Sequence, residues 1–282
     1  MRSNEIIIPG SLKEALKAKA GKNVIPLAGG TDILVRFYNL IEKPWPCLLA
    51  IDGIKALHQI THGKKEVSIG PITTFSEIER SKTLKKFAPQ LVEAASLAGS
   101  VQIRNRATIG GNIANGSPAG DTIPPLYVLG ARLEISSARS KRTVAIEDFF
   151  KGPGLTVLKG NELITDIKID KSSGLGFFQR LATRKALAIS KVSVAASFSL
   201  RKETISSTRI ALGAVAPTVI RAYKTEKYLK GKKFSRDVIE KAALIVKDEA
   251  KPIDDIRSIA AYRKEMAGVL FKRGLEKIMG AI

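Results

Sequence analysis

Residues 107–121 read ATIGGNIANGSPAGD, and the rest of the chain is organised around this stretch. It holds four glycines, two asparagines and the carboxylate of Asp121, with few side chains that could be buried. Such a segment gains little from packing, so its glycines favour positive φ or the close approach of the backbone to a ligand. The stretch therefore predicts a binding loop.

A second glycine pair lies in residues 27–34, LAGGTDIL, after the apolar run Val24–Pro26. Thr31 and Asp32 follow this pair directly, as Asn112 follows the other. Successive N–H groups in such turns form an anion-binding concavity that needs no lysine, and two facing concavities would suit a pyrophosphate. Neither pair fits G-x-G-x-x-G or G-x-x-x-x-G-K-[ST], which excludes the Rossmann and P-loop nucleotide sites.

The composition limits the class of protein. A chain of 282 residues can form one large domain or two modest ones. The single cysteine, Cys47, excludes an internal disulfide and a thiolate set for zinc or iron, so any iron–sulfur cluster belongs to a partner. The first residues lack the apolar core of a signal peptide, and no apolar run approaches the ~18 residues of a membrane span. We therefore expect a cytoplasmic protein with no membrane span.

The net charge of +21 is concentrated toward the C-terminus, where the last 110 residues hold 23 of the 47 basic side chains and 10 of the 26 acidic ones. A strongly basic chain first suggests nucleic-acid binding. The basic residues are scattered without a block of five, and only five Tyr and one Trp are available for base stacking. We expect no nucleic acid, which leaves an acidic protein partner or a solvated lysine-rich surface to account for the charge.

Capping and alternation signals predict two α/β lobes, at about residues 1–55 and 56–172. Capping boxes begin at Ser11 and Thr74, and apolar spacing predicts one helix over residues 84–98. His58 and His62 have metal-ligand spacing only on a helix, and the strand pattern around Gly63 argues against one. The expected strands cover residues 5–8, 24–27, 47–51, 132–136, 143–146 and 162–169.

Residues 171–176 are the best domain boundary, and the pattern changes after them. Three β-rich runs cover residues 177–181, 191–200 and 204–212. Three helical patterns follow at 221–229, 236–249 and 259–279. Residues 173–282 are therefore expected to form a second domain, and the fold class is α+β throughout.

Four stretches together resemble the FAD subunit of molybdenum hydroxylases, which comprises the medium subunits of carbon monoxide dehydrogenase type enzymes and the FAD domain of xanthine dehydrogenases. They are LAGGTDIL at 27–34, RNRATIGGNIANGSPAGDTIPPLYVLGARLEI at 104–135, LGAVAPTVIRA at 212–222 and DDIRSIAAYRKEMAGVLFKRGLE at 254–276. The resemblance covers nearly the whole chain. It implies a PCMH-type FAD-binding domain of two α/β lobes over 1–172, and a C-terminal domain with an antiparallel sheet and a three-helix bundle over 173–282.

The chain has no evident acid–base constellation, so its chemistry must come from a bound cofactor, which the resemblance identifies as FAD. Asp121 would contact the ribose or adenine end, Ile164 the adenine and Arg180 the surroundings of the flavin ring. From the residue pattern alone, Ile164 serves equally as a core residue and Arg180 as a surface charge. The short spacing from Asn112 to Asp121 excludes the variant with an extra iron–sulfur cluster. The pyrophosphate and flavin would be lined by Leu27, Ala28, Gly29, Gly30, Thr31, Asp32, Ile33, Leu34, Thr108, Ile109, Gly110, Gly111 and Asn112.

The resemblance also implies partners. Electrons would pass from a molybdenum cofactor in a large subunit, through two-iron two-sulfur clusters in a small subunit, to this FAD, in a dimer of heterotrimers. Two other functions fit parts of the sequence: a stand-alone flavin reductase of the UDP-N-acetylenolpyruvoylglucosamine type, and a basic nucleic-acid-binding protein. The C-terminal match and the missing catalytic acid count against the reductase. The substrate pocket would lie on another chain, so neither the substrate nor the final acceptor, whether NAD, quinone, ferredoxin or oxygen, follows from this sequence.

Overall fold

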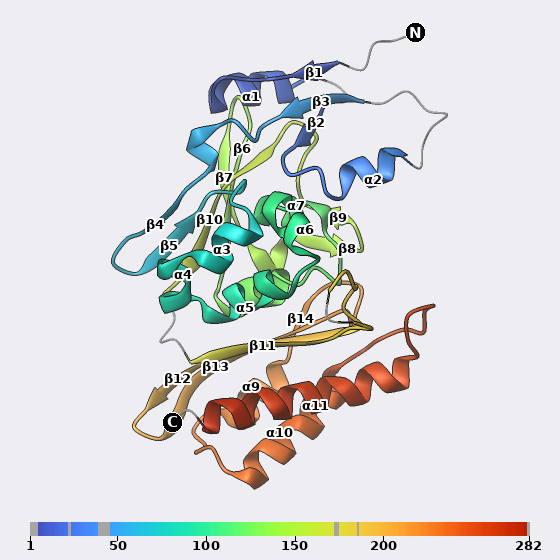
Figure 1. Ribbon diagram of the computed structural model, residues 1–282. Coiled ribbons are helices and arrows are strands. Elements are labelled where there is room, and N and C mark those ends of the chain that lie inside the picture. The colour runs from blue at the N-terminus through green and yellow to red at the C-terminus, as the bar shows by residue number, and fades with distance from the viewer. Residues whose placement is uncertain (1–4, 22–23, 39–45, 172–174, 185, 281–282) are drawn as a thin grey trace.

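The computed structural model describes residues 5–21, 24–38, 46–171, 175–184 and 186–280. Three sheets follow one another down the molecule, and helices fill the spaces beside and between them (Figure 1). The first two sheets belong to the N-terminal part of the chain, and the third belongs to the C-terminal part.

The first sheet is small and parallel, with strand order β1 (Ile6–Ile7), β3 (Cys47–Ala50), β2 (Val24–Leu27). Helix α1 (Leu12–Lys19) begins at the predicted cap, where the Ser11 hydroxyl accepts from the Glu14 N–H. The core of this lobe extends beyond residue 55, because Leu57 and Leu163 are buried in it. Side chains from later in the chain thus complete the hydrophobic core of this lobe.

The second sheet is antiparallel, with strand order β4 (Ile60–His62), β5 (Glu66–Ile69), β10 (Leu163–Asp170), β6 (Arg132–Ser136), β7 (Lys141–Ala145). Side chains alternate between the two faces along each strand, so Val67, Leu133 and Ile167 lie on one face and pack in a core shared with the neighbouring helices. These helices are η1 (Lys55–Leu57), α3 (Phe75–Arg80), α4 (Lys82–Phe87), α5 (Pro89–Leu97), α6 (Val101–Arg106), α7 (Ile109–Asn115), α8 (Ile123–Val128) and η2 (Ile146–Asp148). The hairpin β8 (Phe150–Gly152) and β9 (Leu155–Thr156) completes this part.

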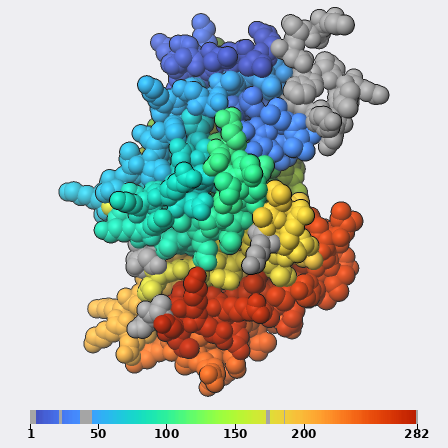
Figure 2. Space-filling view, viewed as in Figure 1, coloured from blue at the N-terminus to red at the C-terminus, as the bar shows by residue number. Residues whose placement is uncertain are grey.

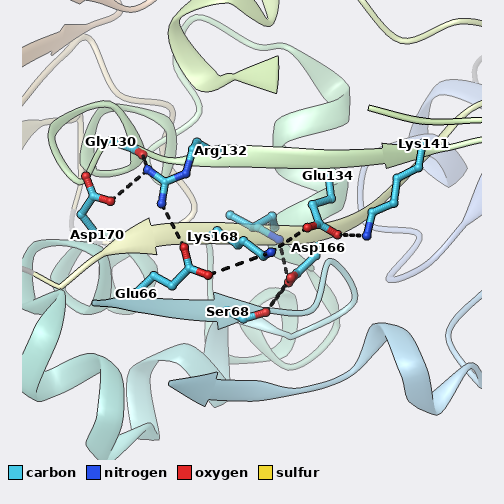
Figure 3. Close-up of polar contacts among 10 residues, drawn as sticks. Glu66, Ser68, Gly130, Arg132, Glu134, Lys141, Asp166, Lys168 and Asp170 are labelled. Carbon is cyan, nitrogen blue, oxygen red and sulfur yellow. Dashed lines mark hydrogen bonds and ion pairs between the residues drawn. The ribbon is translucent and has the colours of Figure 1, made fainter. Parts of the chain in front are cut away.

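The opposite face of the second sheet is charged (Figure 3). Arg132 pairs with Glu66 at 3.1 Å and with Asp170 at 2.9 Å. Lys168 and Lys141 both contact Glu134 on the adjacent strand. Partly exposed pairs of this kind contribute about 0–1 kcal/mol each, so the network mainly keeps this face hydrophilic.

Two predictions about the helices were wrong. The helix expected over residues 84–98 is divided into α4 and α5, because Pro89 lacks an N–H and begins a new helix after Ala88. Residues 107–121 are not all loop, since α7 occupies Ile109–Asn115 and is capped by Thr108. Ile109 and Ile113 are fully buried, so this stretch has more to bury than its composition indicates.

The third sheet has the antiparallel order β11 (Gly176–Leu181), β12 (Val192–Arg201), β13 (Thr204–Gly213), β14 (Ile220–Arg221). Helices α9 (Tyr223–Leu229), α10 (Arg236–Glu249) and α11 (Ala260–Met279) cover one face, which confirms the expected sheet with three helices. On the other face, Phe178 and Ala195 join the core that contains Leu91 of α5 and Leu126 of α8. The yellow-to-red half of the molecule therefore lies directly against the green part (Figure 2).

Candidate cofactor site

A cavity of about 810 Å³ lies between the two glycine-containing segments. Its wall includes residues 28–33 of the first segment, 110–112 of the second, and 187–190 and Arg257 from the C-terminal part. Small-molecule and cofactor sites commonly have volumes of about 300–1,000 Å³. The cavity is thus large enough for a dinucleotide cofactor, and three distant parts of the chain build it.

The first glycine segment has the geometry of an anion-binding turn. It leaves β2 at Leu27, and Gly30 has a φ of 75°, a conformation that favours glycine. In the described part of the chain, no protein atom accepts a hydrogen bond from the N–H groups of residues 29–32. Four adjacent backbone donors on the cavity wall are therefore free to bind a phosphate.

The second glycine segment lacks the expected anion-binding turn, because the protein already uses its N–H groups. Gly110 donates to the Pro71 carbonyl at 2.7 Å, and Gly111 donates to the Thr108 hydroxyl at 3.2 Å. A β-carbon on Gly110 would lie 2.5 Å from the Pro71 side chain, and one on Gly29 would lie 1.8 Å from the Arg106 carbonyl oxygen. The prediction of two facing anion-binding turns was therefore wrong. Gly110 and Gly29 instead allow one segment of the protein to pack closely against another.

A polar cluster joins the two segments at the cavity wall. Asp32 lies 2.9 Å from Nε of Arg36 in α2 (Ile33–Tyr38) and accepts from the Asn115 side chain at 3.2 Å. Arg36 in turn donates to the Asn115 amide oxygen. All three residues line the cavity. Asp32 is thus engaged with protein groups that fix α2 relative to α7.

Asp121 and Arg180 form a buried ion pair, with 2.7 Å between Oδ2 and Nη1. The Ser190 hydroxyl donates to the other carboxylate oxygen at 2.6 Å. Burial raises the pKa of Asp121, and Arg180 and Ser190 act in the opposite direction. The expectation that Asp121 and Arg180 serve separate ends of FAD does not fit this contact. The reading of Arg180 as a surface charge was also wrong, because its side chain is 5% exposed.

Most of the predicted site residues lie on the cavity wall. Those on the wall are Ala28, Gly29, Gly30, Thr31, Asp32, Ile33, Thr108, Gly110, Gly111, Asn112, Asp121 and Ile164. Leu27, Leu34, Ile109 and Arg180 are not on it. Ile164 is buried in the central core and also lines the cavity, so its contact with adenine stays a prediction.

Lys19 and Arg257 line the cavity although the sequence reasoning did not select them. Lys19 is buried and donates to the carbonyls of Val24 and Gly160, and burial lowers its pKa. Arg257 is held by Asp255, which accepts from its Nη2 at 2.9 Å. No local motif marks Lys19, and the only signal for Arg257 was its place in the family-like stretch 254–276.

Residues 2–171 match the family model of the FAD binding domain in molybdopterin dehydrogenase. The chain belongs to this family. Residues 178–278 match the model of the carbon monoxide dehydrogenase flavoprotein C-terminal domain. The molybdenum hydroxylase resemblance is thereby confirmed, and the chain is an FAD-binding oxidoreductase subunit. The stand-alone reductase and the nucleic-acid-binding protein are set aside.

Relatives and solved structures cover nearly the whole chain. The glyceraldehyde dehydrogenase medium chain of Sulfolobus acidocaldarius is 32% identical over 95% of each chain. The carbon monoxide dehydrogenase medium chain of Hydrogenophaga pseudoflava is 32% identical over 95% of this chain and 94% of its own. The solved carbon monoxide dehydrogenase of the same organism matches at a TM-score of 0.91 and 30% identity, over 98% of this chain and 97% of that one. The predicted α+β architecture is confirmed.

The FAD-binding subunits in this family come from enzymes with different substrates. At about the same identity, relatives are named for glyceraldehyde, carbon monoxide and nicotinate. Within the described ranges, no helix is long and apolar enough to cross a bilayer. No group of three or more His, Cys, Asp or Glu side chains there could hold a metal ion.

Proposed function

We propose that this subunit holds FAD in the cavity and passes electrons from the iron–sulfur clusters of a partner subunit to an external acceptor. The N–H groups of residues 29–32, which donate to no atom of the described residues, carry the proposal, because they offer four donors to a pyrophosphate at one place on the wall. Bound FAD would supply the redox chemistry. The chain supplies binding, orientation and exclusion of water.

The other wall residues would contact different parts of the cofactor according to their polarity. Thr31 and Asn112 add hydrogen-bonding side chains near the glycine turns, while Ile164 offers an apolar surface for an aromatic ring. The basic side chains on the wall outnumber the acidic ones by one, a small positive excess that favours an anionic ligand. The basic residues are Lys19, Arg36, Lys159 and Arg257, and the acidic residues are Asp32, Asp121 and Glu162. The donors and the apolar surface together fit a dinucleotide with a charged centre and flat ends.

The assembly proposed for this subunit includes a large subunit with the molybdenum cofactor and a small subunit with two-iron two-sulfur clusters. Two observations support it: relatives are named medium chains, and Cys47 is the only cysteine that this chain could offer a cluster. We further propose a dimer of heterotrimers in the cytoplasm. The division into a PCMH-type domain at 1–172 and a second domain at 173–282 is part of the same proposal.

Comparison of FAD with FMN tests the cofactor assignment. FMN lacks the second phosphate and the adenosine, so it loses the contacts at residues 29–32 that a pyrophosphate would make. We expect purified apoprotein to bind FAD at least tenfold more tightly than FMN, measured by quenching of flavin fluorescence. Equal affinity for the two flavins would contradict the proposal.

A pair of alanine substitutions tests the site itself. Gly30 and Gly154 have similar φ values of 75° and 70°, and only Gly30 lines the cavity. Each substitution forces an L-residue into the left-handed region, at a cost of about 1–2 kcal/mol. We expect Gly30→Ala to lose at least as much thermal stability as Gly154→Ala, because its added carbon would also lie 2.9 Å from Leu34 Cδ1, whereas nothing lies within 4 Å of the carbon added at Gly154. Only Gly30→Ala is expected to lose FAD affinity. A variant Gly30→Ala that binds FAD like the wild type would place the phosphates elsewhere.

A further inference from the structure

Lys19, the last residue of α1, is a buried lysine on the cavity wall, with only 8% of its surface exposed. Its ammonium group donates to the Val24 carbonyl at 2.7 Å and to the Gly160 carbonyl. An ammonium group carries three N–H donors. Among the described residues, no atom accepts from the third donor of Lys19. A buried donor beside the cavity is therefore without a protein partner.

Lys19 also has no carboxylate partner among the residues that the structure describes, and burial alone lowers its pKa. Glu162 lies on the same wall, but its two oxygens accept from the Arg142 guanidinium at 2.9 and 2.8 Å. The other acidic residues on the wall, Asp32 and Asp121, pair with arginines as well. A buried cation is costly unless hydrogen-bond acceptors surround it, so the cavity ligand is the remaining source of an acceptor.

The part of the cavity beside Lys19 is closed and apolar. Ile51 and Leu163 line the cavity and are 7% and 4% exposed. Both pack in the core of the first lobe together with Val24, whose carbonyl accepts from Lys19. Once a ligand displaces water from this end, the third N–H of Lys19 must donate to the ligand or stay unsatisfied.

The two halves of FAD need different surroundings. The flavin exchanges electrons with other molecules, so it belongs where the wall is open to solvent, as at Leu187 and Ile189, which are 56% and 60% exposed. The pyrophosphate would bind at residues 29–32. Val24 lies five residues before Gly29, up to about 16 Å away along an extended chain that rises ~3.3 Å per residue. The closed end at Lys19 is therefore left for the adenosine half.

We propose that the third N–H of Lys19 donates to a ring nitrogen of the adenine of FAD, which makes Lys19 a specificity-determining residue for the adenosine half. Adenine has apolar faces, which suit Ile51 and Leu163, and acceptor nitrogens at its edge. Ribose carries hydroxyl groups that these apolar side chains would leave without partners. The inference rests on the proposed FAD site.

A cycle that combines a protein variant with ligand analogues tests this contact on the full-length chain. Three FAD analogues each carry C–H in place of one acceptor nitrogen of adenine, N1, N3 or N7. We expect one analogue to bind the wild type about tenfold more weakly than FAD, measured by quenching of flavin fluorescence. Lys19→Met should bind FAD about tenfold or more weakly than the wild type does. It should bind that analogue and FAD equally, because the donor is gone.

This equality separates a contact with adenine from a purely structural role. If Lys19 only joined β2 to the turn at Gly160, Lys19→Met would weaken FAD and all three analogues by the same factor. Such a result would overturn the inference. Lys17→Met is the matched control, because Lys17 is an exposed lysine of the same helix and is not on the wall. This variant should keep FAD affinity within twofold of the wild type.

Two further provisions cover loss of folding and loss of the site. If circular dichroism shows that Lys19→Met does not fold, Lys19→Gln, which keeps an amide donor for a carbonyl, takes its place in the cycle with the same expected equality. Wild-type protein that binds all three analogues as tightly as FAD would overturn the inference without any variant. Failure of the wild-type chain to bind FAD would instead refute the proposed function.

Discussion

Gly29 is the residue at which the two glycine-containing segments touch. A methyl group there would lie 1.8 Å from the Arg106 carbonyl oxygen, which is rigid backbone and cannot move aside cheaply. We expect Gly29→Ala to destabilise the protein by about 1–3 kcal/mol or more, as overpacking does in a well-packed region. The unfolding midpoint in urea measures this loss. Gly53→Ala is the control, because nothing lies within 4 Å of its added carbon, and a midpoint equal for both variants would contradict the close approach.

Asp255 gives the loop before α11 a pH dependence. Arg263 holds the pKa of this carboxyl well below its usual range, and the Arg257 N–H and side chain act in the same direction. A depressed folded-state pKa means that the carboxylate stabilises the fold above its ordinary pKa of about 3.9, and that this contribution is lost as the pH falls through the folded value.

We therefore expect Asp255→Asn to unfold at lower urea than the wild type from pH 8 down to about pH 5. The difference should shrink below about pH 4, because the Asp255 carboxyl of the unfolded wild-type chain then binds a proton while the folded carboxylate, with its lowered pKa, stays charged. Urea unfolding at a series of pH values measures this. A difference in urea midpoint that is the same at every pH would show that the substitution acts through shape and not through charge.

Among the elements, those with a clear period were predictable from sequence. Helix α10 occupies Arg236–Glu249 as expected. Strand β12 lies one residue later than expected at both ends, and β13 ends one residue later than expected. Helix α7 was missed because Gly110 and Gly111 have poor helix propensity. It forms because Thr108 caps it and because Gly110 packs against Pro71, a contact distant in sequence.

The site was predictable only where it is local. The first glycine segment could be selected from its own residues, since a turn after a buried strand exposes backbone donors. The pairing of Asp121 with Arg180 spans 59 positions, and no single-sequence pattern encodes such a contact. Lys19 and Arg257 reach the cavity for the same reason, through the packing of whole elements.

For the whole molecule, our hypothesis is that the excess of positive charge helps this subunit to dock with an acidic partner subunit. Lys232 lies over the Tyr228 ring at 4.8 Å, and Lys233 pairs with the exposed Glu203 at 2.8 Å, both remote from the cavity wall. Attraction of this kind raises association rates and is screened over ~8 Å at physiological ionic strength.

We expect the association rate with an acidic partner subunit to fall several-fold between low and high salt. Charge reversals at Lys230, Lys232 and Lys233 should slow association without changing FAD content. Stopped-flow mixing of separately purified subunits measures both effects. A rate indifferent to salt and to the reversals would leave the charge as a solvated lysine-rich surface.

The cavity wall includes residues 28–33, residues 187–190 and Arg257, so the cavity is complete only when these distant parts of the chain have come together. A ribosome adds about 5–20 residues each second, and N-terminal domains generally fold first. At this rate, the ribosome needs tens of seconds, or a little less, to synthesise the chain from the first glycine segment to Arg257. If the proposed site holds FAD, a nascent chain that has not yet reached residue 257 has only an incomplete cavity, and we expect flavin loading to follow synthesis of the C-terminal part.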